Sequence, residues 1–197
     1  MKIQPLILAS QSPRRKMLLE WTHVPFEVIV SDADESYPSN LAMQEVPVFI
    51  AANKAKAVQA KMKANTGGHF DQCIVAADTI VVLEGAVLGK PSDASEAITS
   101  LQALSGKSHQ VITGVVVLYQ GQSHSFSETT NVTFHELTKE QIEFYVENYK
   151  PFDKAGGYAI QEWIGVVGIQ SIQGDFYNVM GLPVSKLLQK IKQLGII

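Results

Sequence analysis

Apolar and polar positions alternate along this chain in blocks whose lengths predict both strands and helices. Short runs rich in β-branched and apolar residues predict strands, and longer segments with apolar residues on one face predict helices. The expected strands are residues 4–9, 26–30, 73–83 and 86–88, followed by two longer ones at about 109–119 and 124–136. The expected helices are residues 13–22 and 45–63, one that ends near Leu104, one from Thr138 to about Asn148, and a last amphipathic helix that Pro183 opens.

Residues that favour turns and helix ends support these boundaries. Ser12 suits the position just before a helix, and Pro13 suits its first turn. Either Ser92 or Asp93 is expected to cap the helix that ends near Leu104. Glu84–Gly85 is expected to form a tight turn between two strands.

The mixture of strands and helices predicts an α/β fold, with a mixed sheet flanked by helices and two lobes around a cleft. No repeat, low-complexity tract or long linker interrupts the chain, so residues 1–197 are expected to form a single domain. Asn65–Gly68 is expected to end the second helix. Residues 155–181 are rich in glycine and are expected to contain short β runs.

Composition narrows the class of protein. The 197 residues are 46% hydrophobic and carry a formal net charge of −3. This size allows a sizeable core, and the charge gives no global basic field for binding nucleic acid or an anionic membrane. No segment has the form of a signal peptide or approaches the roughly 20 apolar residues of a membrane span, so we expect a cytoplasmic protein. The single cysteine, Cys73, excludes an internal disulfide and is expected to be a packed core thiol.

The segment Leu8–Arg15 gathers hydrogen-bond donors at the start of the first expected helix. The donors are the backbone N–H groups of the first turn, the hydroxyls of Ser10 and Ser12, and the guanidinium groups of Arg14 and Arg15. Such a set suits an anion, and phosphate in particular, because arginine offers a planar fork of donors. The alternative is a capped surface helix with two solvated arginines.

Candidate carboxylates come from two parts of the chain. Asp78 lies inside the apolar run 73–83, where an acid is costly to bury unless it is paired, hydrogen-bonded or bound to a metal. It is therefore a candidate metal ligand or general base, and the alternative is an acid at a strand edge that faces water. Asp34 and Glu35 form a second cluster, in which Asp32 and Asp34 are typical turn residues and Glu35 reaches further. Carboxylates from both sources suit a hard cation such as Mg²⁺.

Three further polar residues are candidates for binding. Lys90, next to Pro91, could contact phosphate or be an ordinary solvated turn lysine. Lys54 could do the same, although its spacing with Lys61 predicts a solvent-facing stripe on the second helix. Gln161 both donates and accepts hydrogen bonds, so it could read the edge of a base or tie down a loop.

Other common sites are missing from the sequence. There is no P-loop, no Gly-x-Ser-x-Gly elbow and no Rossmann fingerprint, and the five histidines lack the spacing of a metal site. Trp21 and Trp163 are expected to be packing residues.

Together these residues fall into a series of motifs that resembles the Maf family of nucleoside triphosphate pyrophosphatases. The likeness follows the family's order and runs from residue 6 to about residue 190. Its motifs are Leu8–Arg15, Asp34–Glu35, Asn53–Ala55, Ala77–Thr79, Gly89–Pro91, Leu104–Gly106, Thr113–Val115, Asp153–Gln161 and Asn178–Pro183.

The resemblance implies a central twisted sheet with a deep cleft, related to the inosine triphosphate pyrophosphatases, in a homodimer. It also implies that water attacks the α-phosphorus of a nucleoside triphosphate with the help of a divalent cation, Mg²⁺ or Mn²⁺. Asp78 matches the family's proton acceptor, and Glu35 matches the acidic position associated with the metal, which Asp78 is expected to share. The positions that match the family's phosphate-handling residues are Ser10, Arg15, Lys54 and Lys90.

Three positions resemble the branch of the family that acts on dTTP and UTP, namely Arg14, Thr79 and Gln161. The branch that prefers 7-methyl-GTP has tryptophan where Arg14 stands. The chain departs from the family pattern at Ala33–Asp34 and at Glu162–Trp163. Because the second departure follows Gln161 directly, the preference among UTP, dTTP and modified pyrimidines stays open.

The sequence therefore predicts a dTTP and UTP pyrophosphatase in which Arg14 joins the phosphate-handling residues. The alternative is a non-catalytic, nucleotide-binding regulator of cell division or septum formation, a role with which the family name is associated. The combination of carboxylates and lysines favours the enzyme, since a sensor needs no general base. The expected partners are the nucleotide and a second copy of the chain, with no nucleic acid and no membrane.

Overall fold

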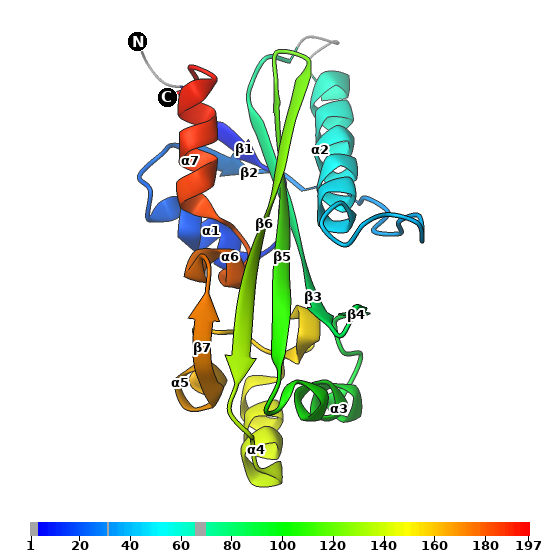
Figure 1. Ribbon diagram of the computed structural model, residues 1–197. Helices are drawn as coiled ribbons and strands as arrows, with labels where there is room; N and C mark the ends of the chain where they lie inside the picture. Colours follow the sequence, from blue (N-terminus) through cyan, green and yellow to red (C-terminus); the bar gives the residue numbers. More distant parts are fainter. Residues whose placement is uncertain (1–3, 31, 66–69) are drawn as a thin grey trace. The chain divides into compact units, whose positions relative to one another are not determined.

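The computed structural model describes residues 4–30, 32–65 and 70–197 of the chain (Figure 1). Within these residues, seven strands form one sheet in the order β2-β1-β3-β5-β6-β7, with β4 paired to β3. The strands are β1 Leu6–Leu8, β2 Phe26–Val28, β3 Ile74–Leu83, β4 Ala86–Leu88, β5 Ser108–Tyr119, β6 Gln122–Phe134 and β7 Ile169–Gln173. β1 pairs in parallel with β2 and β3, whereas β4 and β7 pair antiparallel to their neighbours. The predicted α/β fold with a mixed sheet is confirmed.

Helices account for most of the remaining structure. They are α1 Pro13–Glu20, α2 Val46–Asn65, α3 Ala94–Leu104, α4 Lys139–Tyr149, α5 Trp163–Gly168, α6 Phe176–Met180 and α7 Val184–Gln193, with a 3₁₀ turn η1 at Ala155–Gly157. Ser12 and Asp93 cap α1 and α3, and Thr138 forms a capping box with Gln141 at the start of α4. These local signals were readable because each joins residues three apart in sequence.

The chain divides into two compact units. Unit 1 consists of residues 1–78, 113–128 and 181–197, and unit 2 consists of residues 79–112 and 129–180. β3, β5 and β6 each contribute residues to both units. The expectations of a single domain and of a cleft between lobes stay predictions.

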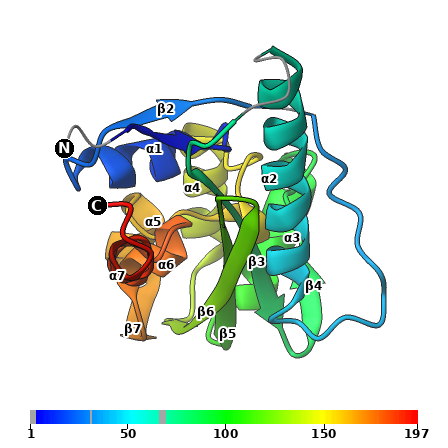
Figure 2. The ribbon, with the colours of Figure 1, turned by 90° about the horizontal axis from the view of Figure 1, so that it is seen from above.

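Unit 1 packs α2 against β1 and β3. Its core contains Ile7, Ile74 and Ala76 from the strands and Ala51 and Ala55 from the helix, all of them buried. α2 lies on one side of these strands, and α1 and α7 lie on the other (Figure 1; Figure 2).

Gly114 on β5 allows the backbone of α2 to approach the backbone of this strand closely. A Cβ atom at this position would lie 2.2 Å from the backbone nitrogen of Val48, so only glycine fits there. The small residues on both sides therefore allow the helix to approach the sheet at backbone distance, and they set where the rest of α2 lies.

Unit 2 contains a buried polar pair beside aromatic rings. His109 is 2% exposed, and its Nε2 lies 2.7 Å from the Oη of Tyr158. The His109 ring stacks on Phe134, and Nδ1 has no hydrogen-bond partner among the described residues. Burial lowers the pKa of His109 to about 4, so the ring is neutral at physiological pH.

The structure corrects two predictions. Residues 155–181 contain one short strand, β7, and otherwise form η1, α5 and α6 instead of several β runs. The close contact of α5 with the preceding loop explains this, because a Cβ on Gly165 would lie 1.7 Å from the carbonyl oxygen of Ile160. Trp21 is 56% exposed and is not a core packing residue, since it lies just past the end of α1.

The structure also bears on three further features, namely Cys73, the end of α2 and the apolar character of the helices. Cys73 is buried as predicted, and burial raises the pKa of its thiol to about 12. α2 ends at Asn65, as expected, while Thr66–Gly68 lie outside the described residues. In the part of the chain that the structure describes, none of the helices combines the length and the apolar character that crossing a membrane requires.

Acid should destabilise the fold through His109. The pKa is about 4 in the folded protein and 6.5 as the ordinary value, so the unfolded chain takes up the proton first as the pH falls. The folded state therefore loses stability between pH 6.5 and about pH 4. From pH 7 to pH 5, the free energy of unfolding should fall by about 2 kcal/mol more in the wild type than in His109→Gln. Urea unfolding at both pH values measures this difference, and equal pH dependence in the two proteins would contradict it.

Candidate active site

The segment after β1 folds into a capped helix start, as its sequence predicts. The backbone N–H of Arg15 lies 3.4 Å from the Oγ of Ser12, and Pro13 occupies the first turn, where its missing N–H costs nothing. Ser10 is buried two residues after the end of β1, and its Oγ accepts a hydrogen bond from the N–H of Ser12. The turn therefore keeps both hydroxyls close to the arginines.

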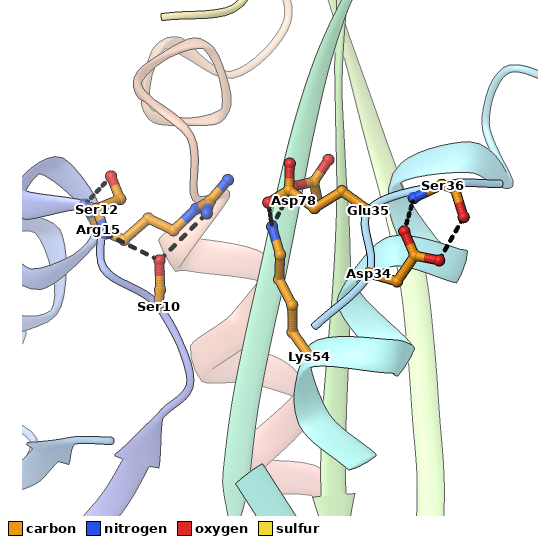
Figure 3. A network of polar contacts seen from close by, with 8 residues as sticks. All are labelled: Ser10, Ser12, Arg15, Asp34, Glu35, Ser36, Lys54 and Asp78. Atoms are coloured by element: carbon orange, nitrogen blue, oxygen red, sulfur yellow. Dashed lines mark hydrogen bonds and ion pairs between the residues drawn. The ribbon is translucent and has the colours of Figure 1, made fainter. Parts of the chain in front are cut away.

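Arg15 is buried, which contradicts the alternative of two solvated arginines. Its Nε donates to the carbonyl of Gly181 at 2.8 Å, and its Nη1 donates to the Oγ of Ser10 at 3.2 Å. Burial lowers the pKa of the guanidinium, the negative charges of Asp78 and Glu35 oppose that shift, and the neighbouring Arg14 adds to it. Figure 3 shows the guanidinium pointing toward these two carboxylates.

Asp78 and Glu35 share one cation. The Nζ of Lys54 lies 2.7 Å from the Oδ1 of Asp78 and 2.7 Å from the Oε1 of Glu35 (Figure 3). The Asp78 side chain is 12% exposed on β3, and the Lys54 side chain is 17% exposed on α2. The solvent-facing stripe predicted as an alternative for Lys54 is therefore wrong. Its helix neighbours Ala51 and Ala55 are in the core, and this directs Lys54 toward β3.

Two acidic residues in the loop before α2, Asp34 and Glu35, make different contacts. Asp34 is exposed, and its carboxylate accepts hydrogen bonds from the N–H and the hydroxyl of Ser36 at 2.8 and 2.6 Å. These bonds lower the pKa of Asp34. Asp34 is thus a turn residue, as its sequence context suggested, whereas the half-exposed Glu35 reaches Lys54.

The donor set at Asp78 and Glu35 fits a hard divalent cation. Among the described residues, no group of three or more histidine, cysteine, aspartate or glutamate side chains is arranged to hold a metal. Mg²⁺ needs fewer protein ligands, because it binds through one or two carboxylates together with substrate phosphates and water. The two carboxylates that converge on Lys54 meet that requirement.

Three predicted residues belong to unit 2, namely Thr79, Lys90 and Gln161. Thr79 follows Asp78 on β3, so its side chain leaves the strand on the opposite face. Lys90 is exposed in the loop after β4, and the carbonyl of Gly89 accepts a hydrogen bond from Gly156 at 3.0 Å. This bond ties the Lys90 loop to the glycine-rich segment that leads to Gln161, which is exposed.

Two buried polar contacts, one in each unit, are missing from the sequence-based prediction. The carbonyl of Gly181 orients Arg15, and a carbonyl leaves no signal in a sequence. Lys154 is buried in unit 2, with Nζ 2.8 Å from Asp153 and 3.5 Å from Glu162. Its position beside Asp153 in a turn resembles that of a surface lysine, so only its burial reveals it.

Removing the shared cation should destabilise the protein. Lys54→Met removes the cation that lies 2.7 Å from both Asp78 and Glu35, which leaves the mostly buried Asp78 without its closest positive partner, and we expect the free energy of unfolding at pH 7 to fall by about 3 kcal/mol. Adding Asp78→Asn should recover part of that loss, because it removes the uncompensated charge. Urea unfolding measures both effects.

Lys61→Met is the matched control for this prediction. Lys61 lies on the same helix, and its Nζ donates to the carbonyl of Val30 at the surface. Its replacement should change the free energy of unfolding by no more than about 0.5 kcal/mol. Equal losses in the two lysine variants would show that the carboxylates do not depend on Lys54.

Comparisons with known proteins identify the family of this chain. The family described as "Maf-like protein" matches residues 5–194. A protein of Phocaeicola vulgatus named "dTTP/UTP pyrophosphatase" is 48% identical over 96% of this chain and 95% of its own length. Proteins of the same name from Parabacteroides distasonis and Porphyromonas gingivalis are 47% and 44% identical, over 98% and 99% of this chain and 97% and 96% of their own lengths.

One solved structure, "The structure of the Staphylococcus aureus Ham1 protein", matches 66% of this chain and 72% of that one with a TM-score of 0.43 and 13% identity. That likeness is too slight to support an argument. The family match and the full-length relatives, in contrast, agree with the resemblance read from the motifs. This chain belongs to the family of Maf-like proteins.

Proposed function

We propose that this protein is a nucleoside triphosphate pyrophosphatase that hydrolyses dTTP and UTP to the monophosphate and pyrophosphate. The observation that carries the proposal is the mostly buried Asp78 held by Lys54 beside Glu35, with the Arg15 guanidinium directed at the carboxylates. The enzymatic name of the full-length relatives favours this function over that of a non-catalytic regulator.

The cationic and hydroxyl groups of the chain would bind the triphosphate. Arg15 is already oriented by Ser10 and Gly181, so it pays little entropy to bind phosphate oxygens. Lys54 would neutralise charge that develops in the transition state. We further propose that Ser10, Arg14 and Lys90 contact the phosphates.

Asp78 would act as the general base. Lys54 donates to its Oδ1, and Oδ2 would accept a proton from the attacking water. The water oxygen bonds to the α-phosphorus, the bond from that phosphorus to the bridging oxygen breaks, and pyrophosphate leaves. Glu35 and Asp78 would hold a divalent cation, Mg²⁺ or Mn²⁺, which when bound neutralises charge on the phosphate oxygens.

Three residues would select the base. Gln161 can donate to and accept from a pyrimidine edge, and a site built on such bonds strongly rejects a mismatched base. We propose that Thr79 and Arg14 assist it. We also propose, from the family resemblance, that the protein is a homodimer in the cytoplasm; light scattering of the purified protein tests the dimer.

Replacing the general base should abolish turnover without unfolding the protein. Asp78→Asn keeps the size of the side chain and the acceptor for Lys54, but an amide cannot take the proton, so kcat for UTP should fall at least about 10²-fold. Pyrophosphate release with Mg²⁺ or Mn²⁺ measures turnover, and circular dichroism checks the fold. Asp71→Asn, at an exposed aspartate before β3, is the control. Near-normal activity of Asp78→Asn would remove Asp78 from the mechanism.

Arg14→Trp should change which nucleotide is used. An indole at this position offers a stacking surface for a purine and removes a charged donor. We expect kcat/KM for UTP and dTTP to fall by more than that for 7-methyl-GTP, by a ratio of about tenfold. Steady-state kinetics with the three nucleotides measure the ratio. Equal losses on all of them would show that Arg14 does not select the base.

A further inference from the structure

The residue proposed to read the base lies in a tight turn within unit 2. The N–H of Glu162 donates to the carbonyl of Ala159 at 3.1 Å, which closes a turn over residues 159–162. Tyr158, Ala159 and Ile160 are buried, whereas Gln161 is exposed. The turn thus presents one polar side chain from an otherwise buried segment.

Tyr145 on α4 bridges the two ends of that turn. Its side chain is fully buried, and its Oη accepts a hydrogen bond from the N–H of Ala159 at 3.1 Å. The same hydroxyl lies 2.5 Å from the Oε2 of Glu162. Because the N–H of Ala159 can only donate, the single hydroxyl proton points to the carboxylate. The bridge runs from Ala159 through Tyr145 to Glu162, and Gln161 lies between its ends.

A buried cation balances the carboxylate in this bridge. The Lys154 side chain is 9% exposed, and its Nζ lies 3.5 Å from the Oε1 of Glu162. The Glu162 side chain is 24% exposed, so water provides only part of its solvation. The two oxygens of Glu162 therefore have different partners, Tyr145 on one side and Lys154 on the other.

The main chain of Glu162 fixes the turn from behind. Its carbonyl accepts hydrogen bonds from Gly165 at 2.9 Å and from Val166 at 3.3 Å, and these begin α5. Gly165 packs directly on the carbonyl of Ile160, where a side chain has no room. The turn, the bridge and the helix together leave the backbone at Gln161 little freedom.

We infer that Tyr145 and Glu162 are positioning residues for base selection, which act through Gln161 without contacting the nucleotide. The inference rests on the proposed function, in which Gln161 binds the base. It also gives a physical role to Glu162, at which this chain departs from the family pattern. Selectivity depends on holding a donor and an acceptor at fixed places, so a loosened turn weakens binding of the correct base more than it slows the chemistry.

The test compares UTP with GTP in variants of the bridge. Tyr145→Phe and Glu162→Ala should each raise KM for UTP about tenfold, change kcat less than about twofold, and lower the preference for UTP over GTP about tenfold. Glu162→Gln keeps an oxygen that accepts from Tyr145, so it should stay within about threefold of the wild type. Adding Tyr145→Phe to Gln161→Ala should cause no further loss of preference, because the bridge acts only through the Gln161 contact.

Matched variants separate positioning from general damage. Tyr149→Phe removes an exposed phenol hydroxyl from the same helix and should behave as the wild type. If Tyr145→Phe fails to fold, Glu162→Ala and Glu162→Gln carry the test. A loss of kcat shared by UTP and GTP, or a Glu162→Gln variant as impaired as Glu162→Ala, would overturn the inference.

The same experiment distinguishes this inference from the proposed function. A wild-type protein that hydrolyses neither UTP nor dTTP would refute the function itself. A wild-type protein that hydrolyses them, with a preference that Gln161→Ala changes and the bridge variants do not, would refute only the inference. An unchanged preference in Gln161→Ala would overturn the inference as well, since the bridge would then have nothing to position.

Discussion

The ammonium group of Lys54 allows the carboxylates of Asp78 and Glu35 to lie close together. Asp78 has little contact with water on β3, Glu35 comes from the loop before α2, and both lie 2.7 Å from the Nζ of Lys54. Carboxylates this close to one another repel unless a cation lies between them. α2 can supply that cation because its alanines pack closely on the strands and because Gly114 leaves room for the start of the helix. The small residues of the core therefore fix the position of Lys54.

Arg15 makes the charges of this region nearly balance. Its guanidinium is buried and held by Ser10 and the carbonyl of Gly181, so it cannot move away from the carboxylates without losing both hydrogen bonds. Two cations thus face Asp78 and Glu35. A triphosphate adds negative charge that these groups cannot balance alone. This gives a physical reason to expect that the substrate brings a divalent cation, with the carboxylates as its protein ligands.

The sequence predicts those parts of the structure that depend on contacts between residues close together in the sequence. Ser12 and Thr138 cap helices where they were expected, because a cap joins a side chain to a backbone group three residues away. The partner of Asp78 could not be read in this way, since Lys54 precedes it by 24 residues and its helical spacing alone predicts a solvent-facing lysine. The prediction of several short β runs in residues 155–181 is wrong for a similar reason. Their glycines allow close packing of α5 against the loop, and that contact is invisible to local preference.

The polar side chains of the two units are held in place in different ways. Direct ion pairs hold those of unit 1, whereas a hydrogen-bonded turn holds Gln161 in unit 2. In unit 1, Lys54 binds the carboxylates of Asp78 and Glu35 directly, so a neutral substitution at any of these three residues changes the charge of the group. In unit 2, Gln161 is exposed, and buried neighbours that carry the turn hold it in place. Phosphates are common to all nucleoside triphosphates, whereas the base distinguishes them. Under the proposed function, substitutions around Tyr145 and Glu162 would therefore shift selectivity while the groups around Asp78 remain intact. A change of substrate would then have to preserve the polar residues of unit 1 and could alter those of unit 2.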